Sequence, residues 1–273
     1  MKLIADSGST KTKFAILDSG VITYALTDGI NPYYQSGEDI VTTLRTQLLT
    51  KIARPGDVKC IEFYGAGCGP ADKIAIVRDA LQSVFADASI IVASDLLGAA
   101  KSLCGDEPGI ACILGTGSNS CHYDGEKIVQ NVSPLGFIIG DEGSGAVLGK
   151  LLVADILKNQ APKSVRDKFF ARYSYTPADI IDRVYRKPFP NRFLASFAPF
   201  LSENIDVTYC HSLVYNSLKS FTDRNLRQYP AGLPVHFTGS VAYYFRAILE
   251  DVMAASGLKI GRIIKEPMEL LVC

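Results

Sequence analysis

The chain carries the same short pattern twice: an apolar strand, a turn of small residues, a second strand, a tight turn and a third strand. The first copy spans residues 3–26 and the second residues 110–132. Aligning Gly8-Ser9 with Gly117-Ser118 brings the first strands into register, and Asp18-Ser19-Gly20 and Asp124-Gly125 are typical hairpin turns. Repetition on this scale indicates a duplicated unit. We therefore expect two related α/β units, the alternative being a chance likeness of two hairpins.

Helical and strand-like segments alternate after each copy. After the first copy, helical periodicity covers residues 38–52, 71–85 and 96–104, and apolar strands cover 59–64 and 88–93. After the second copy the chain is mostly helical, except for a strand at 234–238 that leads into a long helix, 241–255. A boundary near Gly105 predicts domains 1–105 and 106–273, the second carrying a helical insertion rich in proline and aromatic residues.

Composition excludes several classes of protein. The 273 residues include 28 basic and 28 acidic side chains, and 48% of the residues are hydrophobic. A balanced charge without a basic run argues against nucleic acid as a partner. The longest apolar stretches are too short to span a membrane. The early polar residues argue against a signal peptide, and seven cysteines without a CxxC pair indicate reduced, mostly buried thiols. We expect a cytoplasmic globular protein.

The first small-residue turn combines a carboxylate with groups that suit phosphate. Asp6 ends an apolar strand, and the residues that follow it can bind phosphate oxygens through backbone N–H groups, hydroxyls and an ammonium group. These candidates are Ser7, Gly8, Ser9, Thr10, Lys11 and Thr12. Asp6 itself is a candidate ligand of Mg²⁺, because phosphate-bound Mg²⁺ needs only one or two carboxylates. A plain hairpin turn with a solvated lysine is the alternative.

The second turn, Gly115-Thr116-Gly117-Ser118, is a further candidate phosphate site. In a duplicated unit the two turns face each other across a cleft and can hold a triphosphate between them. The P-loop pattern GxxxxGK[ST] is absent from the sequence. Gly65–Pro70 also fails as a dinucleotide fingerprint, because proline stands where the third glycine belongs.

Three further positions complete the candidate site. Asp95 follows an apolar strand, so it is either a base that accepts a proton from a hydroxyl or the N-cap of the next helix. The glycine-punctuated loop before Asp141 can accommodate a polyol, or its acids serve only the helix dipole. Gly239-Ser240 joins a strand to a helix and allows a flat ligand such as adenine to approach the backbone.

This ordered set resembles the acetate and sugar kinase/Hsp70/actin superfamily, specifically the N-acetylglucosamine kinase-like branch of the BadF/BadG/BcrA/BcrD ATPases. The matching segments are Asp6–Thr12, Ser94-Asp95, Leu114–Asn119, Gly140–Ser144 and Thr238–Ser240, in family order over nearly the whole chain. The resemblance implies duplicated ribonuclease H-like (actin-like ATPase) domains with an interdomain cleft. It also implies ATP and Mg²⁺ as cofactors, a small-molecule sugar as substrate, and leaves a homodimer open.

The resemblance also assigns roles. It implies Asp95 as the base toward the 6-hydroxyl of an amino sugar, most simply N-acetylglucosamine. It implies sugar contacts by Asn31, Asn119 and Asp141, and places Gly239 and Ser240 near adenine. The sequence departs from the family at Ser7 and Ser9, at Phe137 and in the tail after Glu266.

Three functions fit this resemblance. The first is an ATP-dependent sugar kinase. The second is a BadF-type regulatory or activator ATPase that acts on a protein partner, although Cys104, Cys112 and Cys121 form a poor set for an iron–sulfur cluster. The third is a non-catalytic sugar sensor. The zinc-dependent bacterial glucokinase class lacks support, because the sequence has no cluster of zinc-binding cysteines.

Overall fold

A computed structural model describes residues 1–8 and 10–272 and divides the chain into two compact units. Unit 1 contains residues 1–105 and the tail that begins at Glu266, and unit 2 contains Asp106–Lys265. The expected boundary near Gly105 therefore coincides with a division of the structure. The tail differs from the expected range 106–273, because buried Met268 packs with Ile4 and Ala15 of the first sheet.

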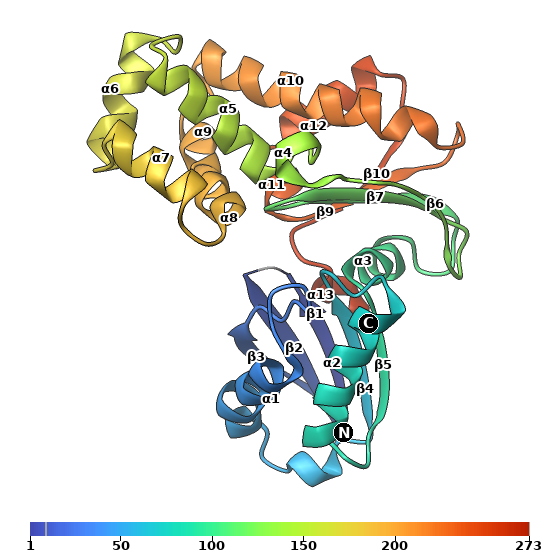
Figure 1. The fold of residues 1–273 in the computed structure, drawn as a ribbon. Helices are drawn as coiled ribbons and strands as arrows, with labels where there is room; N and C mark the ends of the chain where they lie inside the picture. The colour runs from blue at the N-terminus through green and yellow to red at the C-terminus, as the bar shows by residue number, and fades with distance from the viewer. Residues whose placement is uncertain (9, 273) are drawn as a thin grey trace. The chain divides into compact units, whose positions relative to one another are not determined.

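Unit 1 contains a five-stranded sheet in the order β3-β2-β1-β4-β5 (Figure 1). Its strands are β1 (Lys2–Ser7), β2 (Lys11–Asp18), β3 (Val21–Asp28), β4 (Cys60–Gly65) and β5 (Ser89–Ser94). β1, β2 and β3 pair antiparallel, whereas β1, β4 and β5 run parallel. The hairpin and the two crossover strands thus share one sheet, with β1 at its centre.

Unit 2 repeats this topology. Its sheet has the order β8-β7-β6-β9-β10 when read from the hairpin edge. Its strands are β6 (Gly109–Leu114), β7 (Ser118–Tyr123), β8 (Ile128–Val132), β9 (Val235–Thr238) and β10 (Ile260–Ile264). The hairpin pairs are antiparallel and the pairs β6–β9 and β9–β10 are parallel, as in unit 1. The duplication predicted from the sequence is confirmed.

The register of the repeat differs from the one expected. The first hairpin ends with Ser7 opposite Thr12, and the second ends with Leu114 opposite Ser118. Aligning the strands therefore matches Ser7 with Leu114, two residues away from the alignment of the Gly-Ser pairs. In this alignment Asp6 corresponds to Ile113, so only the first hairpin carries a carboxylate at its strand end.

The helices of unit 1 cover both faces of its sheet. One face, with Leu3, Phe14 and Phe63, packs against α1 and α2, and the other face packs against α3 and the tail helix α13. The elements are α1 (Gly37–Thr43), η1 (Leu44–Leu48), η2 (Leu49–Lys51), η3 (Pro55–Asp57), α2 (Ala71–Val84), α3 (Asp95–Cys104) and α13 (Met268–Leu271). The expected helix 38–52 is thus α-helical only at its start and continues as a π-helix and a 3₁₀ turn.

The helices of unit 2 pack against one face of its sheet, the face that carries Ile110, Cys112 and Phe237. Together they form a large hydrophobic core. In Figure 1 the long helices α5, α10 and α12 lie on one side of this sheet. The elements are α4 (Gly136–Ile139), α5 (Gly145–Leu157), α6 (Lys163–Arg172), α7 (Pro177–Tyr185), α8 (Pro190–Ala195), α9 (Ala198–Glu203), α10 (Thr208–Arg224), η4 (Leu226–Gln228), α11 (Ser240–Tyr244) and α12 (Arg246–Ala255).

Two features of unit 2 depart from expectation. The helix expected over 241–255 is interrupted at buried Phe245, whose φ of −105° and ψ of 26° separate α11 from α12. β10 was not predicted, because Gly261 and Arg262 interrupt its apolar run.

Two other expectations can be compared with the described residues. The six described cysteines are free thiols, and five of them are buried. Within the same part of the chain, every helix is too short or too polar to cross a membrane.

Candidate functional site

The parallel strands of unit 1 bring two of the predicted carboxylates to one edge of the sheet. The register places Ser7 beside Gly65 and Gly65 beside Ser94, so β1, β4 and β5 end at the same level. Asp6 precedes the last residue of β1, and Asp95 follows β5 directly. The two acids are close enough that the charge of Asp95 raises the pKa of Asp6. Carboxyl ends of parallel strands are the usual ligand-binding edge of such sheets.

Asp95 is not the cap of its helix. Ser94 is the N-cap residue of α3, and its hydroxyl accepts a hydrogen bond from the Leu97 N–H at 3.2 Å. Asp95 Oδ1 accepts a bond from the neighbouring Leu96 N–H at 2.9 Å. Burial raises the pKa of Asp95 to about 6, because desolvation disfavours the charged carboxylate. The capping alternative considered for Asp95 is wrong, since the serine before it fills that role.

Asp6 has the most strongly raised pKa of the strand-end acids, at about 7. Burial is the largest cause, followed by the charges of Asp95 and Glu266, while Lys11 and Lys13 act in the opposite direction. Two nearby carboxylates and oxygen donors suit a hard divalent cation such as Mg²⁺. Among the described residues no group of three or more His, Cys, Asp or Glu side chains is placed to hold a metal by itself.

The first turn separates exposed from buried candidates. Gly8, Thr10 and Lys11 are exposed, and the Gly8 N–H donates to the Lys11 carbonyl at 3.0 Å. Ser9 lies outside the described residues. Ser7 and Thr12 are fully buried, and their hydroxyl oxygens lie 2.6 Å apart. Their hydroxyls thus hold the turn together from inside.

The same hydroxyls position Asn31. The Ile30 N–H donates to Ser7 Oγ at 3.1 Å and to Thr12 Oγ1 at 3.2 Å. Asn31 follows, with its Oδ1 accepting a bond from the Tyr33 N–H at 3.0 Å. Gly67 packs so closely here that a Cβ would lie 2.6 Å from Asn31 Oδ1. Within Gly65–Pro70, rejected as a dinucleotide motif, the missing side chain of Gly67 therefore leaves room for Asn31.

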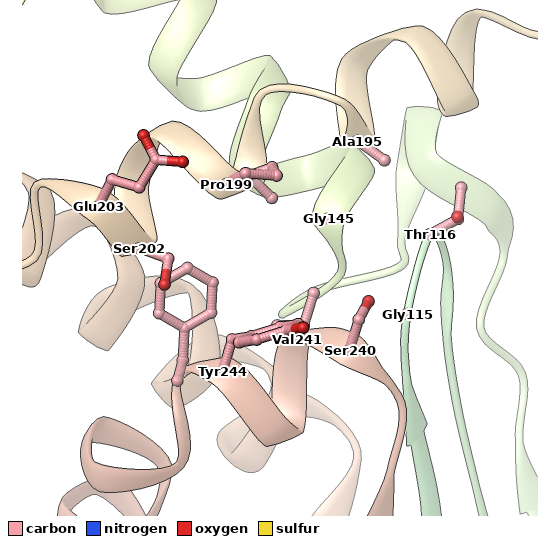
Figure 2. Close-up of a pocket in the computed structure, with 12 residues that line it drawn as sticks. Gly115, Thr116, Gly145, Ala195, Pro199, Ser202, Glu203, Ser240, Val241 and Tyr244 are labelled. Atoms are coloured by element: carbon pink, nitrogen blue, oxygen red, sulfur yellow. The ribbon is translucent and has the colours of Figure 1, made fainter. Parts of the chain in front are cut away.

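Unit 2 contains a cavity of about 440 Å³ that brings three predicted positions together. Gly115, Thr116 and Ser240 lie on one side of it, and Ser202 and Glu203 lie on the other (Figure 2). This volume is in the range of small-molecule and cofactor pockets. The predicted second phosphate turn and the predicted adenosine turn thus border one pocket.

Close backbone contacts form this pocket. Gly239 has a φ of +113°, and a Cβ there would lie 2.3 Å from the Leu114 carbonyl oxygen. Only glycine fits such a contact. The Gly145 N–H at the start of α5 donates to the Gly115 carbonyl at 2.8 Å. The ends of β6 and β9 and the start of α5 therefore meet, and Ser240, which follows Gly239, lines the pocket.

The other walls of the pocket were not predicted from the sequence. They come from α8, α9 and α11 and are mainly apolar or small: Ala195, Ala198, Pro199, Ser202, Glu203, Val241, Tyr244 and Phe245. The sequence indicated helices over these residues, but it carried no signal for the long-range packing that brings α8 and α9 beside the Gly115 turn.

Gly117, Ser118, Asn119 and Asp141 form a separate group in unit 2. Asp141 has a left-handed φ of 54°, and its Oδ2 lies 3.1 Å from where a Gly117 Cβ would stand. The Ser118 N–H points to Asp141 Oδ1 at 3.4 Å. Asn119 Oδ1 accepts from the Ser120 N–H and from Asn131 Nδ2, each at 2.9 Å. Burial raises the pKa of Asp141 to about 6.

The chain is similar to proteins of known structure. Neither the protein-family models nor the curated proteins contain a match to the chain. Among solved structures, a putative N-acetylglucosamine kinase from Porphyromonas gingivalis is 50% identical, with a TM-score of 0.96 over 100% of this chain and 97% of that one.

More distant structures share the fold. A putative N-acetylglucosamine kinase from Chromobacterium violaceum is 17% identical, with a TM-score of 0.75 over 99% of this chain and 97% of that one. A ROK-family glucokinase from Streptomyces griseus, in complex with glucose and AMPPNP, is 16% identical, with a TM-score of 0.57 over 97% of this chain and 93% of that one. The full-length identity to the P. gingivalis protein decides the family: the chain belongs to the N-acetylglucosamine kinase-like family and has the duplicated actin-like ATPase fold of sugar kinases.

Proposed function

We propose that the protein transfers the γ-phosphoryl group of ATP to the 6-hydroxyl of an amino sugar, N-acetylglucosamine. The observation that carries this proposal is the 50% identity, over the whole chain, to a putative N-acetylglucosamine kinase. The carboxylates of unit 1 and the pocket of unit 2 supply the groups that such a reaction requires.

Unit 2 is assigned the nucleoside. The apolar wall of Val241, Tyr244 and Phe245 suits the faces of an adenine ring, and the Ser202 and Ser240 hydroxyls suit its polar edge or the ribose. The Thr116 hydroxyl, which borders the same pocket, suits a phosphate oxygen.

Unit 1 is assigned the transfer of the phosphoryl group from ATP to the sugar. Asp95 accepts the proton of the sugar 6-hydroxyl while that oxygen forms a bond to the γ-phosphorus. The bond from the γ-phosphorus to the bridging oxygen breaks, and ADP leaves with the electron pair. With a pKa of about 6, Asp95 is mostly ionised at pH 7 and is still basic enough to accept the proton.

Asp6 is assigned to the magnesium ion that accompanies ATP. Bound Mg²⁺ neutralises phosphate charge, which is the main contribution of the metal in phosphoryl transfer. The approach of a cation also favours the ionised form of Asp6, whose pKa of about 7 reflects burial beside other carboxylates.

Candidate sugar contacts are assigned within each unit: Asn31 in unit 1, and Asn119 and Asp141 in unit 2. Both asparagines use Oδ1 in internal hydrogen bonds, and within the described residues neither Nδ2 has a hydrogen-bond partner. These amide groups can donate to sugar oxygens, while Asp141 can accept from a hydroxyl. A sugar that lacks one of the matching groups leaves a polar group unpaired, which gives strong discrimination.

The test is to identify the product by ³¹P and ¹H NMR after incubation with ATP, Mg²⁺ and one sugar at a time. The panel is N-acetylglucosamine, glucosamine, N-acetylmannosamine, glucose and a sample without sugar. We expect phosphorylation at O6 of N-acetylglucosamine at the highest rate. ATP hydrolysis at the same rate in every sample would contradict the proposal and favour a regulatory ATPase.

A further inference from the structure

We propose, on the basis of the function proposed above, that Glu266 is the internal counter-ion of the first phosphate turn. Its carboxylate pairs with the Lys11 ammonium until a nucleotide phosphate displaces it. Nothing in the sequence motifs singled out this residue, which lies where the chain returns from unit 2 to unit 1.

Glu266 binds two lysines at once. Its Oε1 lies 2.8 Å from Lys11 Nζ, and its Oε2 lies 2.7 Å from Lys13 Nζ. The Lys11 side chain is 59% exposed, whereas those of Lys13 and Glu266 are about one-quarter exposed. The Lys13 ammonium is also held over the Tyr24 ring, 4.8 Å from its centre. Lys11 is therefore the partner that can exchange Glu266 for an incoming anion.

The pairing lies on the face of the sheet that carries Asp6. Lys13 is opposite Asp6 in the β1–β2 register, and Lys11 lies two residues along the same strand, so the three side chains share a face. Glu266 thus adds a negative charge beside the group assigned to the metal and removes the positive charge assigned to phosphate.

The tail is fixed in this position by contacts of Glu266 and of the residues that follow it. The Ser102 hydroxyl of α3 donates to the Pro267 carbonyl at 2.7 Å, and Met268 is buried with Ile4 and Ala15. The Glu266 N–H donates to Glu269 Oε1 at 2.9 Å. These contacts hold the backbone, so replacing the Glu266 side chain changes the charge while the tail stays in place.

The sign of the effect follows from competition. A phosphate that binds Lys11 must first compensate for the loss of the Lys11–Glu266 pair, and exposed ion pairs contribute up to about 1 kcal/mol. Replacing Glu266 with neutral glutamine removes the Lys11–Glu266 pair and therefore that cost. We therefore expect Glu266→Gln to bind ADP about 2- to 5-fold more tightly. Adenosine, which has no phosphate, binds equally to both proteins.

The experiment is calorimetric titration of the full chain with ADP and with adenosine. Glu266→Asp retains the charge and is expected to keep the wild-type affinity for ADP. Glu62→Gln is the matched control, because it removes the same charge from a carboxylate paired with Lys2 at 2.6 Å. In a Lys11→Met background, Glu266→Gln is expected to give no gain, since the competing pair is already absent. Thermal unfolding verifies that each variant is folded.

The outcomes separate the two proposals. Unchanged or weaker ADP binding by Glu266→Gln, or a gain that persists with Lys11→Met, overturns the counter-ion role alone. A gain of equal size for adenosine does the same. If neither adenosine nor ADP binds the wild-type protein, the proposed function itself fails, and the counter-ion role fails with it.

Discussion

The aspartates whose pKa departs from the ordinary value fall into two groups that shift in opposite directions. Hydrogen bonds from nearby N–H groups, hydroxyls or lysines lower the pKa of several exposed aspartates: Asp39, Asp124, Asp179 and Asp223. Burial instead raises the pKa of Asp6, Asp95 and Asp141. The first group stabilises turns and helix ends. The second is the pattern typical of functional sites, where the fold keeps carboxylates in surroundings that disfavour their charge.

The role of Asp95 predicts a pH dependence. The base must be deprotonated, so kcat at saturating ATP, Mg²⁺ and sugar should rise with pH through the pKa of Asp95, about 6, and level off at higher pH, where Asp95 is ionised. Asp95→Asn should lower kcat by about 10²- to 10⁴-fold and leave the affinity for ADP near the wild-type value. Full turnover by Asp95→Asn would show that Asp95 is not the base.

The contact between Gly67 and Asn31 predicts a selective effect on the sugar. Gly67→Ala places a Cβ 2.6 Å from Asn31 Oδ1, so Asn31 must move and the KM for the sugar should rise. Gly20→Ala is the matched control, because Gly20 has a similar φ of +85° and no atom within 4 Å of the added Cβ. Steady-state kinetics should show the change in Gly67→Ala alone, and equal KM values in both variants would refute the role of Asn31.

At the scale of elements, the sequence predicted the hairpins well because their turns and alternation are local. Gly8, Gly20 and Gly125 mark turns that the structure contains. The sequence did not predict the walls of the pocket, since α8 and α9 reach the Gly115 turn only through long-range packing. It also did not predict that the Ser7 and Thr12 hydroxyls are buried and accept bonds from the Ile30 N–H; their contact with phosphate stays a prediction.

The junction of β6, β9 and α11 predicts how nucleotide binding can be lost. Gly239→Ala brings a Cβ within 2.3 Å of the Leu114 carbonyl oxygen, so the turn that carries Ser240 must shift. We expect the affinity for adenosine to fall at least about tenfold, since ligand contacts depend on such positions. Gly232 is the matched control, because it has a φ of +88° and no atom within 4 Å of an added Cβ. Gly232→Ala should therefore keep the wild-type affinity for adenosine. Calorimetric titration measures the affinity of both variants for adenosine. Equal affinities would show that this turn is not part of the nucleotide site.

At the scale of the whole molecule, the two units are not two consecutive stretches of chain. The tail from Glu266 onward completes unit 1, although the sequence suggested one break near Gly105. The short segment Glu266–Val272 has only a weak hydrophobic pattern, so the sequence does not indicate where it packs. The buried position of Met268 among Ile4, Ala15 and Tyr64 assigns it to the first sheet.

This arrangement predicts that the tail stabilises unit 1. Met268 is 1% exposed, so Met268→Ala should lower the free energy of unfolding by about 2–5 kcal/mol. Leu151→Ala, at a position 41% exposed in unit 2, should cost much less. Denaturant unfolding of the full chain measures both. A negligible loss for Met268→Ala would mean that the tail does not contribute to the folded first unit.

The central claim, phosphoryl transfer from ATP to an amino sugar, is tested most directly by the rate of ADP formation measured with and without N-acetylglucosamine, in wild type and in Asp95→Asn. The account predicts that ADP forms rapidly only when wild-type protein and sugar are both present, with one sugar phosphate formed for each ADP. ADP formation that is independent of sugar, or that survives in Asp95→Asn, would contradict it.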